Sequence, residues 1–140
     1  MPYIKLENNI NNEKLNKLLS YGTTFVGAFS KSCHHCINMQ PEWKKFVHSV
    51  KKQKIRANIL EIDANILSSI KNPLINNNIQ GFPSLFIIKN NKFVASYANE
   101  RTASNFLKFL NKYNSRMSKK STLKRGKDRG SLTKKYRKMY

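Results

Sequence analysis

The sequence predicts an α/β domain in which a mixed sheet carries helices on both faces, followed by a basic, disordered C-terminal tail. Segments with helical and strand-like hydrophobic periodicity alternate along residues 1–114, which favours layers of sheet and helix. Residues 115–140 show neither period and contain too few large apolar side chains to offset the entropy of ordering. We therefore expect one domain over residues 1–114 and a tail over residues 115–140.

The first three predicted elements are a helix, a strand and a longer helix. Three leucines share one face of a helix over residues 11–19. Residues 23–29 mix Phe and Val with small side chains, which is typical of a buried strand. From residue 33 to about residue 50, apolar side chains recur at helical spacing. Pro41 lies inside this segment, and we expect it to kink the helix because proline lacks an N–H and clashes with the preceding turn.

The second half of the domain continues the alternation. Residues 55–62 form a second predicted buried strand, and residues 64–78 form a helical or irregular connector. Two further strands, over residues 84–89 and 92–97, flank an Asn-Asn pair, and asparagine tolerates the positive φ of a tight hairpin turn. Thr102 can cap a final helix whose buried face is aromatic and leucine-rich.

The chain is strongly basic, with 27 Lys and Arg against 7 Asp and Glu, a net charge of +20. Residues 115–140 contain 11 of these basic side chains and one acid, Asp128. Such a segment can contact phosphates without reading bases, so nonspecific binding to nucleic acid or to an anionic membrane surface is one hypothesis. A merely solvated charged run and a nuclear import signal are the alternatives.

The sequence contains no segment that we expect to enter a membrane. The longest charge-free run, residues 72–88, is interrupted by two prolines and a glycine, and the N-terminus lacks the apolar stretch of a signal peptide. We therefore expect a cytoplasmic protein, with a virion or the nucleus as alternatives. The Asn- and Lys-rich composition would suit a large DNA virus.

The chemistry of the sequence is concentrated in Cys33-His34-His35-Cys36, between a predicted strand and a helix start. Two cysteines at this spacing can exchange disulfides or supply thiolates to a metal. For exchange, Cys33 would lie at the helix N-terminus, where free amides favour its thiolate, and Cys36 would be more covered and able to resolve a mixed disulfide. We expect His34 and His35 to lower the pKa of Cys33 further and to make the disulfide a stronger oxidant.

Two alternatives to disulfide exchange are a metal site and a pair of inert thiols. Zinc needs two more ligands, and the candidates are His34, His35 and His48. Adjacent histidines between the cysteines cannot easily complete a tetrahedron, so we expect no metal. A binding module whose thiols take no part in chemistry stays open.

A second motif, Gly81-Phe82-Pro83-Ser84, opens the predicted hairpin. A proline at the start of an edge strand is a candidate for a cis peptide bond. That bond would turn the backbone of Phe82 outward, where it could pair with an extended substrate strand.

Together these motifs resemble a thioredoxin-fold domain over residues 23–113, and in detail a catalytic domain of the protein disulfide isomerases. The matching features are Cys33-His34-His35-Cys36 after a hydrophobic strand, Pro41 eight residues after Cys33, Glu61-Ile62-Asp63, Gly81-Phe82-Pro83, and Tyr97-Ala98-Asn99-Glu100-Arg101-Thr102 followed by residues 106–110.

The resemblance implies a role for each matching residue. Cys33 would be the attacking thiolate and Cys36 the resolving thiol, with His35 at the position of the family's active-site histidine. Pro83 would be the cis-proline, and Arg101 the arginine that tunes the pKa of the second cysteine. The family needs no organic cofactor; it acts on protein cysteines and exchanges electrons with another thiol system.

The sequence also departs from the family pattern. Ser32 stands where an aromatic residue usually precedes the first cysteine, and His34 replaces a glycine. Gly27 occupies the position of a buried carboxylate that helps the resolving thiol exchange its proton. Because this acid is missing, we expect Gly27→Asp or Gly27→Glu to restore it and to speed insulin reduction.

Two other carboxylates, Glu61 and Asp63, lie at the end of the second predicted strand. We interpret them as groups that solvate the strand end and cap a turn.

The sequence thus predicts a thiol–disulfide oxidoreductase of the oxidase or isomerase kind that acts through Cys33 and Cys36. The alternative is a redox-inert adaptor of the same fold, which docks a partner protein at Pro83 and uses residues 115–140 to bind nucleic acid or an anionic membrane.

Overall fold

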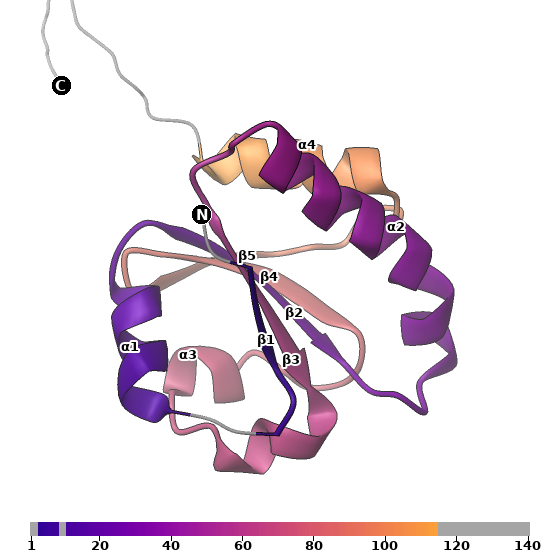
Figure 1. Cartoon of the computed structure of the whole chain (residues 1–140). Helices are drawn as coiled ribbons and strands as arrows, with labels where there is room; N and C mark the ends of the chain where they lie inside the picture. Colours follow the sequence, from indigo (N-terminus) through magenta and orange to yellow (C-terminus); the bar gives the residue numbers. More distant parts are fainter. Residues whose placement is uncertain (1–2, 9–10, 115–140) are drawn as a thin grey trace, which may run out of the picture.

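Figure 1 shows the chain in a computed structural model that describes residues 3–8 and 11–114. Helices and strands alternate through most of the chain, as the periodicity predicts. In chain order the elements are β1 (Tyr3–Leu6), α1 (Asn12–Ser20), β2 (Thr23–Phe29), α2 (His34–Lys52), β3 (Asn58–Asp63), the 3-10 helix η1 (Ala64–Ser69), α3 (Pro73–Asn76), β4 (Ser84–Lys89), β5 (Lys92–Ser96) and α4 (Ala103–Asn114).

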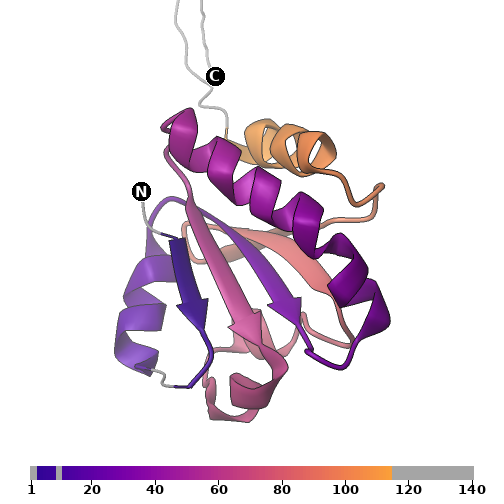
Figure 2. The ribbon, with the colours of Figure 1, turned by 45° about the vertical axis from the view of Figure 1, so that its right-hand side comes forward.

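The strands form one mixed sheet in the order β1-β3-β2-β4-β5. β1, β3 and β2 run parallel, whereas β4 is antiparallel to β2 and β5 is antiparallel to β4. Helices α2 and α4 cover one face, and α1, η1 and α3 cover the other (Figures 1 and 2). The expected fold class, a mixed sheet with helices on both faces, is therefore confirmed.

The central strand β2 is buried along its whole length and contributes to both hydrophobic cores. Because side chains alternate along a strand, Phe25 and Phe29 pack under α2 and α4, and Val26 and Ala28 pack on the opposite face. Gly27 belongs to the same face as Phe25 and Phe29. A side chain at position 27 would therefore point to the α2 side of the sheet.

The indole ring of Trp43 from α2 fills the space beside Gly27. A Cβ atom built at Gly27 would lie 2.9 Å from the tip of Phe29 and 2.9 Å from two atoms of the Trp43 ring. Trp43 is 1% exposed and contacts Phe25 and Phe29 edge-on, so neither ring can move aside freely. Only glycine fits at this position.

Local sequence signals explain several element boundaries. The Asn11 side chain accepts a hydrogen bond from the Lys14 amide at 3.0 Å and caps α1. Thr102 caps α4 as predicted, since its hydroxyl accepts from the Asn105 amide at 3.2 Å. Asn90 and Asn91 have φ values of 50° and 67° and form the tight turn between β4 and β5.

Three expectations about the elements of the chain either need correction or stay open. β1 was not expected, because a four-residue edge strand with a central lysine is too short to show a period. The second buried strand begins at Asn58 rather than at residue 55. The predicted disordered tail lies outside the described residues. Within the described ranges, no helix is both long and apolar enough to cross a bilayer.

Replacing Gly27 by alanine should destabilise the domain, because the added methyl group overpacks a site closed by Trp43 and Phe29. We expect a loss of about 1–3 kcal/mol in the free energy of unfolding, measured by urea denaturation. Gly81→Ala is the matched control, since no atom lies within 4 Å of a Cβ built there. Equal stabilities of the two variants would contradict this account of Gly27.

Candidate active site

The two cysteines occupy the first turn of α2. Cys33 is the N-cap, and its sulfur accepts a hydrogen bond from the Cys36 amide at 3.2 Å. Both are free thiols in this structure, with Cys33 half-buried and Cys36 only 2% exposed. One sulfur is therefore accessible to a partner molecule, and the other is covered by the protein one helical turn away.

The surroundings move the pKa values of the two thiols in opposite directions. The pKa of Cys33 is lowered, first by a hydrogen bond from the Cys36 side chain, and then by backbone hydrogen bonds from Cys36 and His35 and by the charge of Arg101. Burial, together with the hydrogen bond to Cys33, raises the pKa of Cys36 to about 11. At neutral pH, Cys33 therefore loses its proton far more readily than Cys36.

His34 and His35 lie in the first turn of α2, directly after Cys33. Both side chains are exposed, and their ring centroids lie 6.2 Å apart. Among the described groups that lower the pKa of Cys33, His35 contributes through its backbone amide, and neither imidazole is one of them. The pKa of Cys33 is therefore lowered by Cys36, by amides of the helix N-terminus and by the charge of Arg101, and the charge effect of the two imidazoles stays a prediction.

Phe82 and Pro83 come to the thiol from the other half of the chain. The peptide bond between them is cis. The Cys33 thiol donates a hydrogen bond to the Phe82 carbonyl oxygen at a sulfur–oxygen distance of 3.4 Å. Phe82 and Pro83 also line a pocket of about 450 Å³ whose other side chains are polar and uncharged: Asn77, Asn78, Gln80, Ser84 and Ser96, together with Gly81.

Arg101 is an exposed residue just before α4. Its positive charge lowers the pKa of Cys33 and also opposes the rise in the pKa of Cys36. The structure thus brings together all seven residues that the sequence singled out: Cys33, His34, His35 and Cys36 at the start of α2, Phe82 and Pro83 beside them, and Arg101 within electrostatic range.

Sequence reasoning missed a charged cavity behind Cys36. The cavity has a volume of about 230 Å³. It is lined by Lys5, Glu7, Phe29, Ser30, Lys31, Cys36, Ile37, Gln40, Glu61 and Asp63. Its two lysines and three carboxylates form a chain of ion pairs with nitrogen–oxygen distances of 3.6–3.8 Å.

Two of the carboxylates, Glu61 and Asp63, have different tasks. Asp63 caps η1 as expected, because its side chain accepts a hydrogen bond from the Asn65 amide at 2.9 Å. Glu61 is not strand-end solvation: it is buried and accepts hydrogen bonds from Trp43 Nε1 and from the Tyr3 hydroxyl, both at 2.8 Å. The available signal was the spacing of two, which puts both carboxylates on one face of a buried strand.

The expectation for Gly27 is wrong on packing grounds. An aspartate or glutamate there would drive its Cβ into Trp43 and Phe29 at 2.9 Å, as any side chain would. These substitutions therefore disrupt the core and do not restore an acid.

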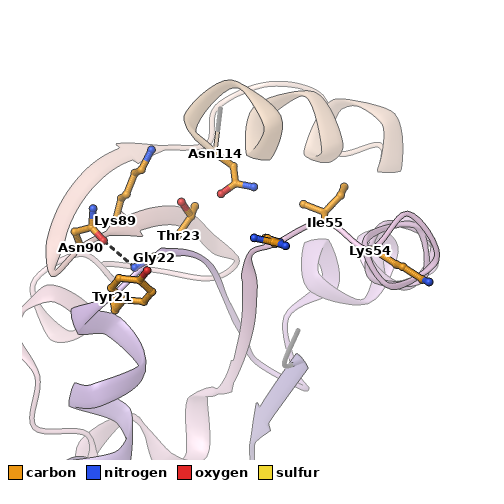
Figure 3. A pocket seen from close by; sticks show the side chains of 9 residues that line it. Tyr21, Gly22, Thr23, Lys54, Ile55, Lys89, Asn90 and Asn114 are labelled. Atoms are coloured by element: carbon orange, nitrogen blue, oxygen red, sulfur yellow. Dashed lines mark hydrogen bonds between the residues drawn. The ribbon is translucent and has the colours of Figure 1, made fainter. Parts of the chain in front are cut away.

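A second pocket lies at the opposite end of β2 and is basic (Figure 3). It has a volume of about 690 Å³, and its lining includes the cations Lys54, Arg56 and Lys89. Lys89 Nζ donates to the Tyr113 carbonyl oxygen at 2.9 Å, and the Asn90 side chain accepts from the Gly22 amide at 2.8 Å. No carboxylate of the described residues lines this pocket.

Among residues 3–8 and 11–114, no group of three or more His, Cys, Asp or Glu is arranged to hold a metal ion. The reactive groups described at this site are two unequal thiols beside a backbone carbonyl.

The fold and the thiol pair define a domain of the thioredoxin-like class, resembling those of protein disulfide isomerases. The family model described as Thioredoxin matches residues 4–112, and the chain belongs to this family.

Relatives with similar domains are distant in sequence. The chain is 22% identical over 101 residues to a Thioredoxin domain-containing protein 5 homolog from Drosophila melanogaster, a match that covers 72% of this chain and 24% of the relative. The chain thus spans about a quarter of the length of that curated relative.

Solved structures show the same fold. The first thioredoxin domain of mouse protein disulfide-isomerase A4 matches with a TM-score of 0.61 at 20% identity, covering 79% of this chain and 74% of that one. The zinc-bound form of human ERp44 matches with a TM-score of 0.64 at 15% identity, covering 80% and 32%. The first two thioredoxin domains of Naumovozyma dairenensis Eps1p match with a TM-score of 0.59 at 22% identity, covering 76% and 40%.

Removing the Cys36 thiol should raise the pKa of Cys33, because the Cys36 side chain is the largest described cause of its lowering. In Cys36→Ala, we expect alkylation of Cys33 at pH 6 to slow several-fold. Cys36→Ser keeps a hydroxyl donor and should stay closer to the wild type. The pH dependence of the alkylation rate measures the effect. Identical profiles for alanine and serine would show that the side-chain hydrogen bond does not set this pKa.

Proposed function

We propose that this domain is a protein thiol–disulfide oxidoreductase of the oxidase or isomerase kind, working through Cys33 and Cys36. The observation that carries the proposal is the opposite displacement of the two pKa values within one helical turn. An accessible thiolate beside a covered thiol is the arrangement that disulfide exchange requires. Family membership supports the same chemistry.

In the oxidising direction, the active form holds a Cys33–Cys36 disulfide. A substrate thiolate attacks the Cys33 sulfur; the bond to Cys36 breaks, and Cys36 takes up a proton. A second substrate thiolate then attacks the substrate sulfur of the mixed disulfide and releases the Cys33 thiolate. Two electrons and two protons leave the substrate dithiol and reduce the enzyme, which a separate disulfide-bearing thiol partner reoxidises.

In the isomerising direction, the reduced form starts the reaction. The Cys33 thiolate attacks a substrate disulfide and forms a mixed disulfide, releasing one substrate thiolate. That thiolate, or another substrate cysteine, can displace Cys33 to give a new pairing. Alternatively, Cys36 attacks Cys33 and frees the substrate in reduced form, which rescues a trapped intermediate.

The groove beside Pro83 suits a polypeptide substrate. Cys33 contacts the Phe82 carbonyl, and the neighbouring pocket offers uncharged amides and hydroxyls from residues 77–84 and from Ser96. Such groups form hydrogen bonds with backbone or polar side chains without demanding a charge. We therefore propose cysteine-containing protein segments as substrates.

The groups around Cys33 favour a reduction potential in the oxidising half of the family's range. The groups that stabilise the Cys33 thiolate stabilise the reduced dithiol and therefore make the disulfide a stronger oxidant. They are Cys36, the His35 amide and Arg101.

A second candidate is a redox-inert adaptor held on a polyanion. The observation that favours it is the basic pocket of Lys54, Arg56 and Lys89, in a chain of net charge +20. In this case the Pro83 groove would dock a partner protein, and residues 115–140 would supply further positive charge for nucleic acid or an anionic membrane.

The proposed activity is tested by the Cys33–Cys36 equilibrium in glutathione buffers, read by thiol alkylation and mass spectrometry. We expect a potential more oxidising than the value of about −270 mV typical of thioredoxin. A potential at or below that value would make the domain a reductase. If no intramolecular disulfide forms, the oxidoreductase proposal fails and the adaptor takes its place.

Trapping variants separate the two cysteines. Cys36→Ser should accumulate a mixed disulfide with a disulfide-bearing peptide through Cys33, because the resolving thiol is missing. Cys33→Ser should accumulate none, since the remaining thiol is covered and its pKa is raised. Equal trapping by both variants would contradict the assigned roles.

A further inference from the structure

The parallel pairing of β1, β3 and β2 places an unusual row of residues beneath the first turn of α2. In register, Lys5 pairs with Glu61, Glu61 pairs with Gly27, and Gly27 pairs with Leu85. The row therefore carries a buried carboxylate one strand away from a glycine that cannot accept a side chain. Glu61 and Cys36 line the same cavity.

Cys36 needs a proton acceptor if the proposed function is right. Its thiol must lose a proton before it can attack a mixed disulfide, and its thiolate must regain one when it is the leaving group. Burial and the hydrogen bond to Cys33 hold the pKa of Cys36 near 11, so very little thiolate exists at neutral pH. A base in contact with the same cavity would remove this obstacle.

Three carboxylates line the cavity, and two of them are committed elsewhere or open to solvent. Asp63 accepts a hydrogen bond from the Asn65 amide and faces Lys31 at 3.6 Å. The Glu7 side chain is 35% exposed and lies between Lys5 and Lys31. Asp63 is thus buried but serves as the cap of η1, and Glu7 is not buried.

Glu61 is buried and firmly oriented, yet one of its oxygens remains available. Its side chain is 10% exposed. Oε1 accepts hydrogen bonds from Trp43 and Tyr3, whereas the described contact of Oε2 is Lys5 Nζ at 3.7 Å, longer than a hydrogen bond. The carboxylate is thus fixed through one oxygen, and the other can accept a proton.

We propose that Glu61 accepts and returns the proton of Cys36 through water in the cavity that the two residues share. A volume of about 230 Å³ has room for several water molecules, since each takes about 30 Å³. When Cys36 attacks, its proton passes through water to Glu61 Oε2, and the sulfur forms a bond to Cys33 while the substrate sulfur leaves as a thiolate. When Cys36 is the leaving group, the proton returns from Glu61.

Tyr3 and Trp43 are positioning residues in this scheme. Burial, together with the hydrogen bond to Glu61, raises the pKa of Tyr3, so its hydroxyl stays protonated at neutral pH and continues to donate to Glu61. The Trp43 ring fills the space at Gly27, and its N–H binds Glu61. The same indole therefore excludes an acid from β2 and holds one on β3.

Charged groups from three parts of the chain surround Glu61. Lys5 lies beside it on β1, and Glu7 and Lys31 continue the chain of ion pairs to Asp63 on its own strand. Tyr3 and Cys36 are the remaining titratable groups that face the carboxylate or its cavity.

The test isolates the step in which Cys36 acts. Cys33 is loaded with glutathione as a mixed disulfide at low pH, and the release of glutathione is followed after a jump to pH 7. Glu61→Gln keeps an oxygen acceptor for Trp43 and Tyr3 but removes the base. We expect glutathione release to slow at least tenfold, within the range of general base catalysis. The deficit should shrink as the pH rises, because hydroxide then removes the Cys36 proton without help from a carboxylate.

Glu7→Gln is the matched control, because it makes the same chemical change in a more exposed side chain of the same cavity. It should release glutathione within twofold of the wild type at every pH. Alkylation of Cys33 should be nearly unchanged in both variants, which shows that the first turn of α2 is intact.

Two results would overturn the role of Glu61. One is release from Glu61→Gln at the wild-type rate at pH 7; the other is a slowing that is equal at all pH values, which indicates a structural effect only. Failure of the proposed function itself looks different: in that case the wild-type protein releases no glutathione, because Cys36 does not attack at all.

Discussion

The packing of Trp43 against the backbone of β2 is the contact that organises the active-site end of the domain. The ring lies where the side chain of residue 27 would be, and it joins the aromatic core formed with Phe25 and Phe29. Its N–H binds Glu61 on the neighbouring strand. Because α2 carries Trp43 two turns after Cys36, this one side chain fixes the helix that presents both thiols relative to the strands beneath them.

Around this contact, the molecule separates exposed chemistry from buried chemistry. On the exposed side, Cys33 lies at the helix N-terminus, next to the Phe82 carbonyl and the polar pocket beyond it. On the other side, Cys36 lines a small charged cavity together with residues of β1, β3 and the loop after β2. The two thiols are three residues apart in the sequence, and their different environments shift their pKa values in opposite directions.

Short-range signals in the sequence were enough to predict the fold and the thiol site. Hydrophobic periodicity defined β2, α2 and α4, and the cysteine spacing placed Cys33 at a helix start. The proton relay was beyond such reasoning, because Glu61 meets Gly27 only through strand pairing across more than thirty residues of chain. β1 was missed for the same reason: four residues with a central lysine become a strand only when β3 is present beside them. The sequence shows that Gly27 lacks a side chain, but it does not show that the Trp43 ring from α2 occupies the space beside it.

The two ends of β2 differ in the charged side chains that surround them. Around the Cys36 cavity, two lysines face three carboxylates, whereas the pocket at the other end of β2 is lined by Lys54, Arg56 and Lys89 with no described carboxylate. The seven residues of β2 separate these ends by about 20 Å, at roughly 3.3 Å per residue. Cys33 follows the far end of β2, away from the basic pocket. An anion attracted to the basic pocket would therefore act at the end of the sheet remote from the reactive sulfur.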